Sequence, residues 1–294
     1  MPLSRTQNRR SSMDEHQYLY AIGWANCQVP PLGFGVDPRF PVQSVPCGQL
    51  AALASRVGLD RFDLTKLQEG ATDVQWLSEV ARRHSAIVGE AANCGPVLPL
   101  RLGIVFHSRD SLQEKLLRVE DRVADFLRFL GDRREWAIKV YLDEVLAERE
   151  LLSAGFHTGE ASDQPDRAGA ARGQGTLYLH ARQQQKARRT QLQVIVRREL
   201  LAVDDSLQGL ADEWRQLRTL PGALLDRPQQ MVWNGAFLLP RSGESAFQTE
   251  WMRLKQGLAP KGLILEASGP WPAYHFCPAL EPGGDNDATL SPGR

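Results

Sequence analysis

The chain has 294 residues, of which 42% are hydrophobic and 24% charged, so it has enough apolar material for a packed globular core. Its 35 lysines and arginines balance its 35 aspartates and glutamates, and the formal net charge is zero. This balance argues against a protein built mainly for non-specific nucleic-acid binding, which needs a basic excess.

The first part of the chain is rich in β-strand patterns. Residues 1–16 are polar and are expected to form a disordered tail. Aromatic and aliphatic residues at 17–24 predict a strand, and residues 42–56 predict one or two more. Between them, residues 29–41 form a loop rich in proline and glycine.

Two amphipathic helices are predicted next, at 72–88 and 111–130, from apolar residues that recur every three or four positions. Thr72 and Gln75 suit a capping box for the first helix, and Ser111 and Glu114 suit one for the second. Gly131 stands where a left-handed cap would end the second helix. The apolar run 97–106, interrupted by Pro99, and residues 136–143 read as strands.

The second half alternates strands with helices. Its predicted elements, in order, are a flexible insertion at 157–174, a long helix at 176–218, a strand at 231–239, a helix that begins near Ser245, a strand at 263–267 and a disordered tail at 279–294. The last strand leads into Gly269-Pro270-Trp271-Pro272, an extended exit suited to a sheet edge because proline lacks an N–H.

This order predicts an α+β chain with two domains. The first, at 17–100, is a β-rich α+β domain. The second, at 101–278, places helices on one face of an antiparallel sheet around the long helix, as in a modified ferredoxin-like fold.

The four cysteines, Cys27, Cys47, Cys94 and Cys277, are scattered and lack the spacing of a zinc site. We expect free thiols in a reducing compartment, and neither a metal nor a cofactor. The N-terminal residues lack the apolar core of a secretory signal, and no apolar run approaches the ~20 residues that cross a bilayer. We therefore expect a cytoplasmic protein.

Three stretches of the sequence together resemble the GvpL/GvpF family of gas vesicle proteins. They are Tyr18-Leu19-Tyr20-Ala21-Ile22, His84 followed by the run 97–106 (VLPLRLGIVF), and residues 269–276 (GPWPAYHF). The last resembles the family's GPWPPY-x-F motif, with Ala273 where a second proline is common.

The resemblance implies two α+β domains, the second a modified ferredoxin-like fold. It implies a non-enzymatic accessory or minor structural protein of gas vesicle assembly, located at the gas vesicle. Its expected partners are the small hydrophobic shell protein and other accessory proteins. Nucleic acid, lipid membranes and small-molecule substrates are not expected to bind.

The candidate partner-binding residues are Arg101, Trp271, Tyr274 and Phe276. Rigid aromatics and arginine are over-used at interfaces, although large aromatics also close domain cores, and Arg101 also suits a structural ion pair. No phosphate-binding loop, dinucleotide motif or nucleophile elbow occurs in the sequence, so no catalytic residue is assigned.

Two features of the sequence can be interpreted either as functional or as structural. His84 lies on the apolar face of its helix without a histidine or acidic partner one turn further on, which favours a buried structural histidine over a catalytic base. A basic run on the long helix offers a nucleic-acid-binding regulator as the alternative function, although a solvated face that docks an acidic accessory protein agrees better with the neutral chain. Its residues are Arg182, Lys186, Arg188, Arg189, Arg197 and Arg198.

Overall fold

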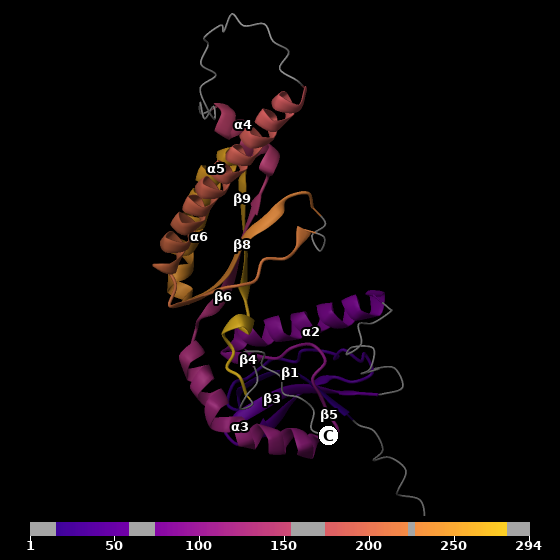
Figure 1. The fold of residues 1–294 in the computed structure, drawn as a ribbon. Helices are drawn as coiled ribbons and strands as arrows, with labels where there is room; N and C mark the ends of the chain where they lie inside the picture. The colour runs from indigo at the N-terminus through magenta and orange to yellow at the C-terminus, as the bar shows by residue number, and fades with distance from the viewer. Residues whose placement is uncertain (1–15, 59–73, 154–173, 223–226, 281–294) are drawn as a thin grey trace, which may run out of the picture. The chain divides into compact units, whose positions relative to one another are not determined.

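In a computed structural model, the described residues (16–58, 74–153, 174–222 and 227–280) form two compact units of mixed helix and sheet (Figure 1). The first unit holds residues up to Glu135 and from Pro270 onward, and the second holds residues 136–269. The predicted mixture of helix and sheet is confirmed. The division differs from the expected boundary after residue 100, because the helix that follows packs on the first sheet.

The sheet of the first unit is organised around a buried central strand. Its strands are β1 (His16–Trp24), β2 (Val42–Cys47), β3 (Leu50–Val57), β4 (Val97–Pro99) and β5 (Val105–Phe106). The order is β2-β3-β1-β4, and β5 also pairs with β1. β1 runs antiparallel to β3, β4 and β5, and its residues from Tyr18 to Ile22 are fully buried.

The region 42–56 resolves into two strands, β2 and β3, which pair antiparallel. Gly48 joins them with a φ of 57°, a left-handed conformation that favours glycine. Pro46 is tolerated because β2 lies at the edge of the sheet.

Two helices accompany this sheet, α2 (Val74–Cys94) and α3 (Arg109–Leu130). α3 packs against β1, β2 and β4. The cap predicted at Thr72 lies outside the described residues. The cap predicted at Ser111 is wrong by one turn, because Ser108 is the N-cap and its side chain accepts from the Ser111 N–H at 3.1 Å. Gly131 ends the helix at the predicted position with a φ of 51°, but its ψ of −119° is not that of the left-handed cap predicted there.

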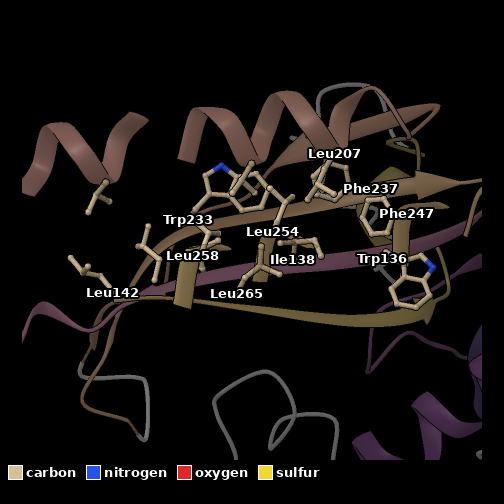
Figure 2. Packing of buried hydrophobic residues seen from close by; sticks show 14 of the residues in the cluster. Trp136, Ile138, Leu142, Leu207, Trp233, Phe237, Phe247, Leu254, Leu258 and Leu265 are labelled. Carbon is tan, nitrogen blue, oxygen red and sulfur yellow. The ribbon is translucent and has the colours of Figure 1, made fainter. Parts of the chain in front are cut away.

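The second unit contains a four-stranded sheet in the order β7-β8-β6-β9. Its strands are β6 (Arg134–Leu142), β7 (Glu213–Gln216), β8 (Gln230–Leu239) and β9 (Leu263–Trp271), of which β6 and β9 each have one end in the first unit. Its helices are α4 (Glu144–Ser153), α5 (Gln174–Gln208) and α6 (Glu244–Leu258). Side chains from the strands, α5 and α6 meet in one buried cluster, which includes Trp136, Ile138, Leu207, Phe237 and Phe247 (Figure 2).

The long helix ends ten residues earlier than predicted. The helical spacing of Leu207, Leu210, Trp214 and Leu217 extends the pattern, but α5 stops at Gln208 and Trp214 lies in β7 opposite Phe237. The backbone N–H of Leu217 donates to Asn234 O at 2.8 Å. Pairing with β8 therefore overrides the local helical pattern.

The last strand is longer than predicted, because β9 continues through Pro270 to Trp271. β9 is an edge strand, the kind of strand in which proline is tolerated because one side of it has no ladder to pair with. The terminal tails and the insertion predicted at 157–174 lie outside the described residues, with three exceptions. His16 is the buried first residue of β1, α5 begins at Gln174, and residues 279 and 280 pack within the first unit.

Gly262, in the turn before β9, is expected to resist substitution. Its φ is 74°, and a Cβ there would lie 2.6 Å from the backbone N of Ala147. Gly262→Ala should lower the free energy of unfolding, measured by urea titration, by about 2 kcal/mol or more.

Gly257 in α6 provides the matched control, since a Cβ there meets nothing within 4 Å. Gly257→Ala should raise the free energy of unfolding by about 0.5–1 kcal/mol, because alanine is the better helix former. Equal effects of the two substitutions would contradict the strain assigned to Gly262.

Candidate partner-binding site

A buried hydrogen-bond network joins β1 to α2 and to the segment after β4. The Tyr18 Oη lies 2.9 Å from His84 Nδ1, and the Gly103 N–H donates to the same oxygen at 3.2 Å. His84 Nε2 lies 2.9 Å from the carbonyl oxygen of Leu100. Because a carbonyl only accepts, Nε2 carries the hydrogen and Nδ1 accepts from the tyrosine hydroxyl. The imidazole is therefore a neutral connector between three chain segments.

Burial sets the charge state of this network. It lowers the pKa of His84 to about 4, and it raises the pKa of the Tyr18 hydroxyl well above its usual range. Both groups are neutral near pH 7, so the network supplies fixed hydrogen bonds rather than a charged base. The reading of His84 as a satisfied structural histidine agrees with this geometry.

A second buried tyrosine holds the loop at 29–41. The Tyr20 Oη lies 2.8 Å from Ser55 Oγ and accepts from the Val36 N–H at 2.8 Å. Burial raises the pKa of Tyr20 to about 12. Gly35 allows this approach, because a Cβ there would lie 2.2 Å from Ser55 Oγ. The loop, whose conformation the sequence does not predict, is thus fixed against β1 and β3.

The C-terminal segment (residues 270–280) packs on the first unit after the chain leaves the second. Glu135 is buried, and its carboxylate accepts from the His275 N–H at 2.9 Å and lies 2.6 Å from His275 Nδ1. Arg122 Nη1 donates to the Ala279 carbonyl at 2.8 Å. Four apolar side chains of the segment are buried, namely Ala273, Phe276, Cys277 and Leu280. The segment therefore completes the core of the first unit.

The three stretches that carry the family resemblance converge in this unit. Tyr274 packs against the buried cluster that contains Tyr18, and Leu102 packs against the same cluster. The Cys277 Sγ lies 3.8 Å from the Pro99 carbonyl oxygen. Residues far apart in the sequence thus form one packed region, which we take as the candidate site.

The predicted site residues separate into surface and interior positions. Arg101 is exposed, and Trp271, at the end of β9, is 49% exposed. Tyr274 is partly buried, and burial raises its pKa well above the usual range. Phe276 is only 5% exposed. In this conformation, Arg101 and Trp271 are accessible to a partner, whereas Phe276 packs inside the unit.

The sequence did not predict the residues that hold the C-terminal segment in place. Glu135 and His275 are 140 positions apart, and Arg122 and Ala279 are 157 apart. A glutamate at the start of a strand is usually solvated, so its type gives no sign of burial. The pairing is set by tertiary contact.

The sequence profile of the family described as "Gas vesicle synthesis protein GvpL/GvpF" matches residues 16–278. That match covers most of the chain and includes all three stretches described above. The chain belongs to the GvpL/GvpF family. The resemblance stated from the sequence is thereby confirmed, and a role in gas vesicle assembly is supported.

Two curated members of the GvpL/GvpF family are similar over nearly their whole length. Gas vesicle protein L from Streptomyces sp. (strain CB03234) is 27% identical over 270 residues, which cover 92% of this chain and 96% of the relative. Gas vesicle protein F from the same strain is 26% identical over 264 residues, which cover 87% and 98%.

Solved GvpF structures share the fold. The crystal structure of GvpF from Anabaena sp. PCC7120 matches with a TM-score of 0.64 at 19% identity, covering 90% of this chain and 97% of that one. GvpF from Microcystis aeruginosa matches with a TM-score of 0.61 at 18% identity, covering 90% and 99%. At these identities the likeness concerns the fold alone.

Within the ranges given above, no three histidine, cysteine or acidic side chains gather as a metal site. Across the same ranges, no helix is both long and apolar enough to span a bilayer. The four cysteines are free thiols.

His84 should make the stability of the fold depend on pH. The unfolded chain protonates this residue near its usual pKa of 6.5, whereas the folded chain resists protonation until about pH 4. Acidification between these values favours the unfolded chain, so this contribution is present above pH 6.5 and is lost toward pH 4. It should fall by about 2 kcal/mol between pH 7.5 and pH 5.

His84→Gln isolates this contribution, because glutamine can accept from Tyr18 and donate to Leu100 but does not titrate. Urea unfolding of both proteins at the two pH values should show a smaller loss for the variant. The other titrations cancel in the comparison, and an equal loss in both proteins would contradict the assignment.

Proposed function

We propose that this chain is a non-enzymatic accessory or minor structural protein of gas vesicle assembly, and that it binds the hydrophobic shell protein through a surface centred on Trp271. The family match over residues 16–278 supports the assembly role. The single observation that carries the surface is the half-exposed Trp271 at the end of an edge strand.

Physical chemistry supports this choice of partner. A shell protein that assembles through β-structure exposes apolar surface and strand edges before assembly, and it would aggregate if left unprotected. An edge strand with a rigid indole offers both backbone pairing and apolar contact. Burying a half-exposed tryptophan is the kind of contact that forms an interface hot spot.

The surroundings of Trp271 favour a rigid surface. The following residues are anchored by Glu135, and the Cys277 Sγ faces the Pro99 carbonyl oxygen. A preorganised surface binds more tightly because it loses less conformational entropy. Arg101, exposed next to the buried Leu100, is the polar residue that we assign to the same function.

We also propose a modified ferredoxin-like fold for the second unit. Its strands and major helices follow the order β6-α4-α5-β7-β8-α6-β9, and its sheet order is β7-β8-β6-β9. In this proposal the long α5 is the modification. We propose the gas vesicle as the protein's location and its other accessory proteins as further partners.

The surface can be tested by binding to the purified gas vesicle shell protein of the same organism. Trp271→Ala should weaken binding by about tenfold or more, because removing a hot-spot aromatic costs at least about 1–2 kcal/mol. Biolayer interferometry with the shell protein immobilised gives the dissociation constant.

Trp214→Ala is the matched control, because Trp214 is 37% exposed and also lies on an edge strand, β7. It should leave binding unchanged within about twofold. Full binding by a folded Trp271→Ala protein would remove Trp271 from the interface. Failure of the unmodified chain to bind the shell protein would remove the proposed partner.

A further inference from the structure

The charges on α5 are strongly one-sided. From Arg182 to Arg198 the helix carries six basic side chains and no acidic one, in a chain with zero net charge. Among the residues that the structure describes, Arg198 pairs with Glu199, and the other five have no salt-bridge partner. Their positive charge is therefore available to a ligand.

The basic residues form an ordered stripe with apolar ones. Positions 182, 186, 189, 193, 196 and 200 are separated alternately by four and three residues, so they share one face of the helix. The stripe begins with Arg182, Lys186 and Arg189, passes Gln193 and ends with Val196 and Leu200. It spans roughly 27 Å at 1.5 Å per residue.

Two hollows follow this stripe. One, of about 520 Å³, has a described lining that comes from α5, through Arg182, Lys186, Arg189 and two glutamines. The other, of about 390 Å³, lies beside Val196 and Leu200, with Met231 and Val232 of β8 in its wall. Arg189 lines both hollows, so they adjoin at this side chain, and we call the two together the α5 track, which is basic at one end and apolar at the other.

Charged groups border the apolar hollow. Arg189 and Arg197 lie on the α5 side, and Glu144 of α4 is the one acidic residue among the described residues of its lining. Leu192, Val196 and Met231 are buried and form the floor, whereas Leu200 and Val232 are partly exposed. The hollow thus combines an apolar floor with a mainly positive border.

We infer that this α5 track is a docking surface for an acidic amphipathic helix of another protein. Apolar side chains of the partner would lie over Val196, Leu200 and Val232, and its carboxylates would meet Arg182, Lys186 and Arg189. Helix-in-groove recognition uses such a periodic apolar stripe, and opposite charges fix the direction in which the helix lies.

The same features disfavour a nucleic acid as the ligand. A sugar-phosphate backbone has no apolar face to bury over Val196 and Leu200. Proteins that bind single strands add aromatic side chains on which bases stack, and none of the described residues that line these two hollows is aromatic. An acidic amphipathic helix would contact both the basic end and the apolar end of the track.

A designed peptide can serve as the probe. It is a fluorescein-labelled helix of about 20 residues, long enough for the track at 1.5 Å per residue, with glutamates on one half of its heptad stripe and leucines on the other. Fluorescence anisotropy with the full chain, at about 0.15 M salt where exposed charges are largely screened, gives the dissociation constant.

Lys186→Glu combined with Arg189→Glu should weaken binding by about tenfold or more, because two attractive contacts become repulsive. Arg241→Glu combined with Lys255→Glu makes the same change in net charge at exposed positions outside the track. This control should bind within about twofold of the unmodified chain. Circular dichroism verifies that both variants are folded.

Two further probes test the apolar end. Replacing the leucines of the peptide by serines should weaken binding by about fivefold or more, because the floor would lose its apolar contact. A single-stranded oligodeoxynucleotide of equal formal charge should bind more weakly than the leucine peptide.

The inference fails if the leucine peptide does not bind, if the serine peptide binds as tightly, or if the control variant weakens binding as much as the track variant. Equal or tighter binding of the oligonucleotide would instead make the track a nucleic-acid surface. The test changes none of the residues that we propose to bind the shell protein, so its failure would leave that proposal unaffected.

Discussion

The buried contact between Tyr18 and His84 is the constraint on which the first unit depends. It connects the central strand to α2 and, through Gly103 and Leu100, to the segment between β4 and β5. Removing one partner would leave buried polar groups unsatisfied, at a cost of about 1–3 kcal/mol each. A neutral imidazole suits this position because it donates from one nitrogen and accepts at the other.

The C-terminal segment depends on the surface that this network supports. Its apolar side chains fill the same unit, and Glu135 fixes its backbone through His275. Trp271 remains half exposed at the start of this fixed segment. The arrangement separates two uses of aromatic residues, since Tyr274 and Phe276 pack the core while Trp271 is presented to solvent. This separation narrows the proposed shell-protein surface to Trp271 and Arg101.

The second unit shows how one helix can serve two purposes. Val203 and Leu207 of α5 are buried in the core around β8 and α6, whereas Arg182, Lys186 and Arg189 face outward. Val196 and Leu200 belong to both parts of the helix, because they line the hollow beside β8 and also contact the core. One part of this helix therefore packs in the core, while its basic part stays exposed to solvent.

The sequence by itself determined the family, the mixture of helix and sheet and most elements, because hydrophobic periodicity and short motifs are local properties. It could not locate the end of α5, since Trp214 continues a helical pattern and only pairing with β8 makes it a strand. It could not place the boundary between the units, because the C-terminal segment returns to the first one.

The candidate site divides in the same way. Arg101, Trp271, Tyr274 and Phe276 were identifiable by residue type and motif, but their exposure was not, because burial depends on which distant segments cover a side chain. Glu135, buried against His275 across 140 positions, gives no local signal at all. Residue type and local motif therefore identify the candidate partner-binding residues, whereas long-range packing determines which of them are exposed to a partner.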